Sequence, residues 1–403
     1  MTERPFTILC LASELKGVPF IQECKRQGCR VLVLMPDDKQ DAPWPWESID
    51  QHFAMPNISK QPDVTYAVSY LMRGQKIDCI VALDDYDVAT AASLREHLRI
   101  PGMGETTARH FRDKLAMRVQ ARDEGVQVPP FTAVFNYDDL RAYMADVPAP
   151  WVLKPRFEAG AIGIRKLHDS EQVWRALDKL GDQQSYYLLE KFVPGDVYHV
   201  DSIIWEKDVV FTIASKYGLP PLTVSHGGGI FTTRVLPWDG EEAITLRGLT
   251  SELMRKLRLV RGVSHTEFIR GYEDGRFYFL ETAARVGGAN IDRMVQAATG
   301  IELWQEAARI ELANLRGEAY APPEYRREYA GLLTCLSRQE YPDLSAYNDP
   351  EVVWRVPKAY HAGLLTASWE QSRIEHLIAS YAERFAQDFL TTAPPKSDAR
   401  TTF

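Results

Sequence analysis

The sequence predicts an α/β protein that begins with a doubly wound domain and continues into a larger mixed α/β and α+β region. Three observations lead to this fold class. Apolar strand-like runs alternate with helical segments over the first hundred residues, and two glutamates face each other in an apolar hairpin near residue 270. The length of 403 residues also exceeds what one ordinary hydrophobic core accommodates, so two or three domains are expected.

The N-terminal segment has the pattern of a parallel sheet with covering helices. We expect strands at 6–12, 30–35 and 77–83, and helices at 18–27 and 88–98. Ligands of such sheets bind beyond the carboxyl ends of the strands. Asp84, Asp85 and Asp87 follow the third predicted strand and are placed to meet a substrate there. The alternative is that these carboxylates only cap the helix that follows.

The middle of the chain reads as a mixture of helices, hairpins and one long loop. The expected helices are 106–124, 171–180, 240–257 and 291–312, and the expected strands are 151–154, 164–167, 186–192, 199–205 and 209–215, followed by a loop at 216–233. Near the C-terminus, strands are expected at 331–337, 351–356 and 362–367, and an amphipathic helix at 368–390. These elements suggest units at 1–103, 104–318 and 328–390, with a disordered tail at 391–403.

Composition excludes several partners. The net charge of −8 does not favour a nucleic acid or an anionic membrane. No apolar run approaches transmembrane length, and the first residues do not resemble a signal peptide. The five cysteines are odd in number and lack metal-type spacing, so we expect buried free thiols in a cytoplasmic protein.

The predicted hairpin carries Glu267 and Glu281. A three-residue loop ending in Gly275 would place Tyr272 opposite Arg276 and, by the same count, Glu267 opposite Glu281. Like charges opposite each other destabilise a sheet, so a cation between them is expected. Mg²⁺ held by one or two carboxylates and by substrate phosphates is the candidate, and Mn²⁺ is its alternative. The other reading is a chance pair on a solvated face. Strict alternation places Ile269, Phe277 and Phe279 on the same face as these glutamates.

A glycine-containing turn follows Lys154 and contains Gly160 and Gly163. Such a turn can direct backbone N–H groups at phosphate oxygens. The spacing matches neither a Walker A loop nor a dinucleotide-binding Gly-x-Gly-x-x-Gly motif, so the turn is informative only together with the charged residues around it.

The charged residues occur in a characteristic order, which runs Lys114, Lys154, the glycine turn, Glu190-Lys191, Glu267, Glu281, Arg285 and Gly287-Gly288. Over residues 100–315 this order resembles the ATP-grasp superfamily of carboxylate–amine ligases and biotin carboxylases. The first hundred residues resemble the Rossmann-like domain that precedes the ATP-grasp fold in that superfamily.

The resemblance implies a role for each matching position. Lys114 and Lys154 would contact nucleotide phosphates, and Gly160 to Gly163 would form a flap over them. Glu190, Lys191 and Val193 would bind adenine, Glu267 and Glu281 would hold Mg²⁺, and Arg285 would face the γ-phosphate or the reacting carboxylate. The catalytic residues would be Arg285 and Lys154. Relatives often have a ribose-binding glutamate at the position where this chain has Val197. Asp196, His199 or Asp201 would substitute for it.

A second departure concerns the metal. Relatives commonly have an asparagine two residues after the second glutamate, where this chain has Ala283, so the number of metal ions is open.

The resemblance predicts a ligase that uses ATP and Mg²⁺ to join a small carboxylate, activated as an acylphosphate, to an amine such as an amino acid. The alternatives are an enzyme of the biotin carboxylase type and an ATP-binding regulator that does not catalyse. The C-terminal segment is expected to be a substrate cap or the contact of a homodimer.

Overall fold

The computed structural model describes residues 4–392, so most of the tail predicted at 391–403 lies outside the described residues. The N-terminal part is a four-stranded parallel sheet in the order β3-β2-β1-β4. Its elements are β1 (Thr7–Leu11), α1 (Val18–Arg26), β2 (Arg30–Pro36), β3 (Gln51–Met55), α2 (Asp63–Leu71), β4 (Cys79–Ala82) and α3 (Val88–Leu98). The doubly wound fold predicted for this region is confirmed, although the sequence analysis did not predict β3 and α2.

A second, smaller sheet has four antiparallel strands in the order β5-β8-β6-β7. It consists of β5 (Phe131–Ala133), α6 (Tyr137–Asp146), β6 (Trp151–Pro155), β7 (Arg165–Leu167), α7 (Ser170–Leu180) and β8 (Tyr187–Lys191). Its core contains Leu140 and Val173 from the helices and Leu153 and Leu189 from the strands, so the two helices cover one face of this sheet.

The largest sheet has eight strands in the order β13-β12-β9-β10-β11-β14-β16-β15. Its strands are β9 (Gly195–Trp205), β10 (Asp208–Tyr217), β11 (Phe231–Val235), β12 (Gly262–Gly271), β13 (Phe277–Ala283), β14 (Tyr329–Leu336), β15 (Val352–Arg355) and β16 (His361–Ser368). The C-terminal strands therefore extend the central sheet, and the unit proposed at 328–390 shares its sheet with the unit proposed at 104–318.

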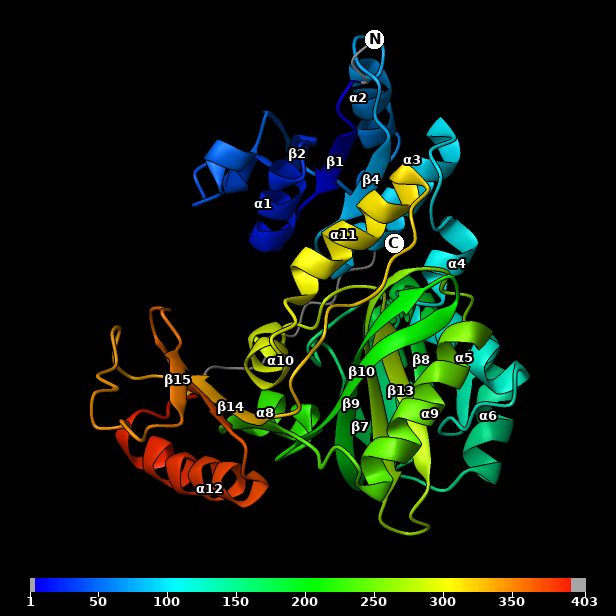
Figure 1. The fold of residues 1–403 in the computed structure, drawn as a ribbon. Helices are drawn as coiled ribbons and strands as arrows, with labels where there is room; N and C mark the ends of the chain where they lie inside the picture. Colours follow the sequence, from blue (N-terminus) through cyan, green and yellow to red (C-terminus); the bar gives the residue numbers. More distant parts are fainter. Residues whose placement is uncertain (1–3, 393–403) are drawn as a thin grey trace.

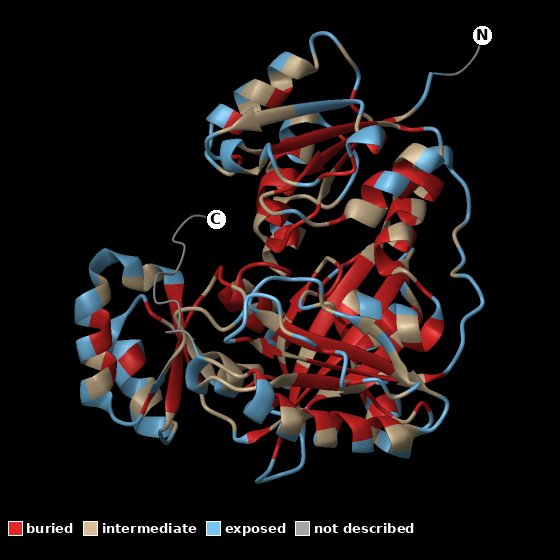
Figure 2. Cartoon of the chain, turned by 90° about the vertical axis from the view of Figure 1, so that its left-hand side faces the viewer, coloured by how far each residue is buried: buried red, intermediate tan, exposed pale blue. Residues whose placement is uncertain are grey.

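Helices cover both faces of this sheet. They are α8 (Pro221–Gly227), α9 (Glu241–Lys256), α10 (Ile291–Thr299), α11 (Leu303–Arg316) and α12 (Gln371–Asp388). In Figure 1, α11 lies between the central sheet and the N-terminal domain, where it packs against α1, and α12 covers the C-terminal strands. Figure 2 shows that the buried residues fill the sheets and the inner helix faces, and the predicted apolar stripe of α12 is among them.

Two predicted helices are wrong because each is interrupted by a cap. The helix expected at 106–124 is α4 (Glu105–Arg109) followed by α5 (Lys114–Asp123), since Asp113 is extended and accepts hydrogen bonds from the first amides of α5. The helix expected at 291–312 is divided into α10 and α11 by Gly300, which has a φ of 83°. The side chain of Glu302 then caps α11 by accepting hydrogen bonds from backbone N–H groups of its first turn.

The loop expected at 216–233 is also wrong. It contains the end of β10, the short helix α8 and the first part of β11. The strand β11 forms because it pairs with both β10 and β14, and β14 is almost a hundred residues away in sequence. This pairing connects the two parts of the large sheet.

Candidate active site

The hairpin formed by β12 and β13 places Glu267 opposite Glu281, as predicted. The register near the turn is different from the expected one. Gly271 N–H donates to Arg276 O, so the loop has four residues, and Arg270 pairs with Phe277. A register shift between Phe268 and Glu267 then restores the predicted pair, with Leu280 as the additional residue of a β-bulge.

The bulge changes which side chains share a face. Leu280 and Glu281 both line the same cavity as Glu267 and Ile269. Phe279 packs instead in the core under α9, and Phe277 packs against that core. The expectation that the two phenylalanines share the face of the glutamates is therefore wrong, because it assumed uninterrupted alternation.

The cavity between the small sheet and the central sheet has a volume of about 350 Å³. Eight of the residues predicted for the site line it, namely Lys114, Lys154, Gly160, Glu190, Lys191, Val193, Glu267 and Glu281. Its remaining walls are largely apolar and include Val152, Val197 and Ile269. A cavity with an apolar wall and several convergent charges is typical of a ligand site.

Lys154 and Glu190 form a buried ion pair at one side of this cavity. Lys154 Nζ lies 2.5 Å from Glu190 Oε1, and Arg118 Nε lies 2.7 Å from Glu190 Oε2. Burial lowers the pKa of Lys154, whereas for Glu190 the two cations outweigh burial and lower the pKa of the carboxyl. One carboxylate thus compensates two buried cations, and a phosphate at Lys154 would complete the charge balance.

Lys114 lies at the first position of α5 and reaches across to the hairpin. Its Nζ is 2.8 Å from Glu281 Oε2 and donates to the carbonyl oxygen of Glu158 at 2.6 Å. Burial opposes ionisation of Glu281, but Lys114 outweighs it and lowers the pKa of that carboxyl. Asp113, the cap of α5, also binds Arg156 at the start of the glycine turn, so the lysine and the turn are held together.

The glycine turn and α8 form the rim of the cavity. Gly160, Ala161 and Gly163 have φ values of 67°, 62° and 71°, the left-handed conformation that favours glycine. Gly160 lines the cavity, as do Pro220, which precedes α8, and the first residues of α8, 221–223. The side chain of His226, further along α8, is exposed.

The lining of this cavity does not include Asp196, His199, Gly163 or Arg285, which were also predicted for the site. Asp196 instead accepts hydrogen bonds from Lys216 Nζ at 2.6 Å and Tyr272 Oη at 2.9 Å. His199 is fully buried. Gly163 lies in the glycine turn without lining the cavity. The ribose-binding role of Asp196 or His199 therefore stays a prediction.

Arg285 lies outside the first cavity and lines a second one of about 260 Å³ beside the N-terminal domain. Its Nε is 3.5 Å from Asp85 Oδ1, and Arg112 Nη1 is 2.9 Å from Asp85 Oδ2. Burial opposes ionisation of Asp85, but the two arginines lower the pKa of its carboxyl. Of the three N-terminal aspartates, Asp85 thus contacts the predicted catalytic arginine, whereas Asp84 caps the 3₁₀ turn Asp85–Asp87.

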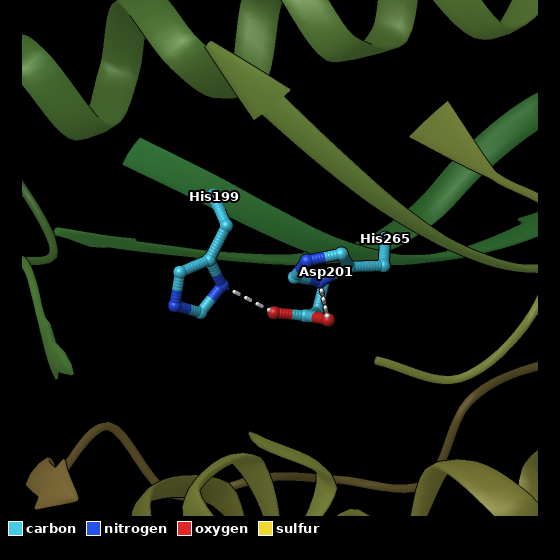
Figure 3. A group of neighbouring side chains, drawn as sticks. All are labelled: His199, Asp201 and His265. Atoms are coloured by element: carbon cyan, nitrogen blue, oxygen red, sulfur yellow. Dashed lines mark hydrogen bonds and ion pairs between the residues drawn. The ribbon is translucent and has the colours of Figure 1, made fainter. Parts of the chain in front are cut away.

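A group that the sequence analysis did not identify lies beside Glu267. His199 Nδ1 is 2.8 Å from Asp201 Oδ2, and His265 Nδ1 is 2.9 Å from Asp201 Oδ1 (Figure 3). Burial lowers the pKa of His199. For His265 burial has the same effect, but Asp201 and Glu267 outweigh it and raise the pKa to about 10. The alternation of His199 and Asp201 on one predicted strand, and His265 two residues before Glu267, were the available signals.

The donor groups suit a nucleotide and a divalent cation. Glu267 and Glu281 offer two carboxylates from adjacent strands, and Lys114 and Lys154 offer two ammonium groups. Mg²⁺ in proteins is commonly held by one or two carboxylates together with substrate phosphates. Ala283 is buried opposite His265 and supplies no third side-chain ligand.

Part of the chain matches a known class, namely proteins with an ATP-grasp domain. Residues 111–289 match the family model of this domain. The first 110 residues and the C-terminal strands lie outside the matched region.

Two of the curated relatives are ligases that act on amino acids by name. The chain is 26% identical over 260 residues to an L-arginine-specific L-amino acid ligase of Bacillus subtilis, covering 62% of each protein. It is 23% identical over 254 residues to an alanine–anticapsin ligase of Bacillus subtilis (strain 168), covering 57% of this chain and 52% of that one. The matches thus span less than two thirds of these relatives.

Solved structures show the same fold. An L-amino acid ligase from Bacillus licheniformis superposes with a TM-score of 0.76 at 16% identity, over 97% of this chain and 100% of that chain. The N5-carboxyaminoimidazole synthetase of Staphylococcus aureus, complexed with ADP, superposes with a TM-score of 0.68 at 16% identity, over 93% and 97% of the two chains. No helix among the described residues is long and apolar enough to cross a membrane.

Proposed function

We propose that this protein is an ATP- and Mg²⁺-dependent ligase that activates a small carboxylate as an acylphosphate and joins it to an amine. The observation that supports this most directly is the convergence of Lys114, Lys154, Glu267 and Glu281 in one cavity. Phosphoryl transfer is catalysed mainly by positioning and charge neutralisation, and these residues provide both.

The cavity gives each part of ATP a matching environment. The apolar wall at Val197 and Ile269 and the segment 191–193 would receive adenine. The backbone N–H of Lys191 already donates to Pro130 O, so adenine would use other backbone groups of this segment. Lys114 and Lys154 would bind phosphates, and the glycine turn would cover them.

The metal would lie between Glu267 and Glu281. When bound, Mg²⁺ neutralises phosphate charge and orients the γ-phosphate for transfer. Lys114, which pairs with Glu281 in this structure, would turn toward phosphate when the metal occupies its place. Tyr217 donates to Glu267 at 2.7 Å and would hold that carboxylate in place.

The reaction has two steps. A carboxylate oxygen of the substrate attacks the γ-phosphorus, the bond to the β-phosphate oxygen breaks, and ADP leaves. The amine nitrogen then attacks the acyl carbon, the acyl–oxygen bond breaks, inorganic phosphate leaves, and the nitrogen loses a proton to solvent. Arg285, a fork-shaped cation, would bind the carboxylate or the transferred phosphate.

The names of the two ligase relatives support an amino acid as at least one substrate. Both substrates would be small molecules. The five cysteines are free and buried, which supports a cytoplasmic location. Oligomerisation as a homodimer through the C-terminal strands stays a proposal.

ADP release with a panel of paired amino acids, analysed for amide products by mass spectrometry, tests the proposal. We expect ADP, phosphate and a dipeptide in equal amounts for at least one pair. ADP release that requires bicarbonate and gives no amide would instead support a carboxylase of the biotin-dependent type. ATP binding without turnover under any pairing would support a regulator.

A further inference from the structure

We propose that His199, Asp201 and His265 form a positioning unit, which fixes the positions of Glu267 and of the loop 285–290 relative to each other. We call these three residues the His–Asp–His chain. The inference rests on the proposed function, because Glu267 is the proposed metal ligand. None of the three residues lines the cavity, so they would act through the groups that they contact.

The pairing of β9 with β12 creates this chain. The register places His199 opposite Glu267 and Asp201 opposite His265. Both carboxylate oxygens of Asp201 accept a hydrogen bond, one from each histidine Nδ1 (Figure 3). His199 Nε2 lies 2.7 Å from Thr233 Oγ1 on β11, so the chain connects three strands of the sheet.

A metal site is the competing explanation for this group. Its three potential ligand atoms lie within 4.8 Å of one another. However, both Nδ1 atoms are directed at Asp201, and the second nitrogen of His199 is directed at Thr233. Since these atoms already have hydrogen-bond partners inside the protein, the geometry favours a hydrogen-bonded chain over a bound ion.

One end of the chain reaches the proposed metal ligand. His265 Nε2 lies 3.6 Å from Glu267 Oε1, and Tyr217 donates to the same oxygen at 2.7 Å. The ring of Tyr217 packs against the ring of His199 with centroids 4.8 Å apart. Glu267 is thus held from two sides, by His265 of the chain and by Tyr217, which packs against His199, and these contacts limit the rotation of its carboxylate.

The other side of the chain supports the loop that follows Arg285. A Cβ atom at Gly287 would lie 2.8 Å from Asp201 Oδ1 and 2.9 Å from His265 Nδ1. The backbone of the loop therefore rests directly on the chain, and no larger residue fits there. Ala289 and Asn290 then adopt φ values of 53° and 64° before α10 begins. The same three side chains thus set the positions of the Glu267 carboxylate and of the loop 285–290.

This arrangement has a measurable consequence. Partners that orient a metal ligand typically affect metal affinity by about 10- to 100-fold. Loss of the chain should therefore weaken the Mg²⁺-dependent part of nucleotide binding. The Mg²⁺-independent part, which depends on Lys114 and Lys154, should change little.

Isothermal titration of ADP at increasing Mg²⁺ concentrations tests the inference without catalysis. Asp201→Asn removes an acceptor from the chain, and we expect the Mg²⁺ midpoint to rise at least about tenfold. Ser264→Ala is the matched control, because Ser264 is a buried neighbour of His265 whose hydroxyl has no hydrogen-bond partner among the described residues. This control should behave as the wild type.

Two substitutions at His265 give a second test. This test decides the question when the Asp201→Asn variant does not fold. His265→Asn can retain the donor to Asp201 but does not reach Glu267, whereas His265→Gln can place its amide nitrogen near the position of Nε2. We expect His265→Gln to retain more Mg²⁺-dependent ADP binding than His265→Asn. Gly287→Ala, which crowds Asp201, should also raise the Mg²⁺ midpoint.

The outcomes separate this inference from the proposed function. Wild-type ADP binding that does not respond to Mg²⁺ would overturn the proposed function, and this inference with it. Mg²⁺-dependent wild-type binding, together with unchanged midpoints in folded Asp201→Asn or in both His265 variants, would overturn the positioning role alone.

Discussion

Replacement of Glu190 by glutamine should strongly destabilise the protein. The Glu190 carboxylate contacts Lys154 and Arg118, and the three side chains are only 3%, 10% and 0% exposed. Removing one partner of a buried ion pair costs roughly 3–5 kcal/mol, because the remaining charge is left uncompensated in a medium of low polarity. Glutamine has a similar shape, so the loss would come from charge and hydrogen bonding and not from a cavity.

The lower end of that range applies here. Burial already lowers the pKa of Lys154, so this lysine can lose its proton and relieve part of the cost. Arg118 offers no such relief, because arginine side chains are not deprotonated in proteins. We therefore expect a loss of about 3 kcal/mol, which corresponds to a fall in Tm of about 6–12 °C for a cooperative unit of 150–250 residues.

Thermal and urea unfolding, followed by tryptophan fluorescence, would measure this loss. Glu273→Gln at the exposed tip of the hairpin is the control and should change stability by no more than about 0.5 kcal/mol. Saturating ADP should reduce the difference for Glu190→Gln, since a phosphate would compensate Lys154. A loss below about 1 kcal/mol would refute the reasoning, because it would show that the buried cations do not depend on Glu190.

Three further predictions concern the metal, pH and a helix cap. Glu281→Gln should lower ATP turnover at least about 100-fold and abolish Mg²⁺-dependent ADP binding, while Glu273→Gln should retain both; equal loss in the two variants would contradict the metal role. Burial raises the pKa of Asp87 in the folded state to about 7. Between about pH 4 and 7 the folded protein therefore holds a proton on this carboxyl that the unfolded chain has released, so the free energy of unfolding falls as the pH rises. Asp87→Asn should therefore make stability fall less steeply over that interval in urea titrations, and an unchanged slope would contradict the assignment. Asp113→Ala should destabilise the protein by at least about 1 kcal/mol, because it removes the cap of α5 and the partner of Arg156, and a change within error would show that neither contact matters.

Local sequence patterns predicted most of the N-terminal domain. Its buried strands are continuous apolar runs, and α3 begins and ends where the pattern places it, at Val88 and Leu98. One of the failures occurred where a distant partner decides the local structure. The cap at Asp113 that divides the predicted helix 106–124 is held by Arg156, which lies 43 residues further along the chain.

The acidic hairpin shows the same distinction within one motif. The residue types predicted a hairpin with two opposed glutamates, and the structure confirms that pair. The prediction used the wrong turn register, and the bulge at Leu280 compensated for it. The amide of Phe279 donates outside the hairpin to Gln127 O at 2.8 Å, a tertiary contact that the hairpin sequence does not contain.

The sequence by itself determined the composition and order of the site. Lysines, glutamates and a glycine turn occur in an order typical of the ATP-grasp domain, and side chains of these types suit phosphates and a divalent cation. Alternation along the strands also indicated which residues share a face, except at the bulge of β13, where Phe277 and Phe279 pack in or against the core and not beside the glutamates.

Only the tertiary structure decided which of those faces meet. The register of β9 against β12 brings Asp201 to His265 across more than sixty residues, and domain packing brings Asp85 to Arg285 across two hundred. Strand pairing and domain docking depend on non-local contacts, whereas periodicity in a sequence describes only how each element is oriented. For that reason the His–Asp–His chain beneath Glu267 became evident in the folded protein alone.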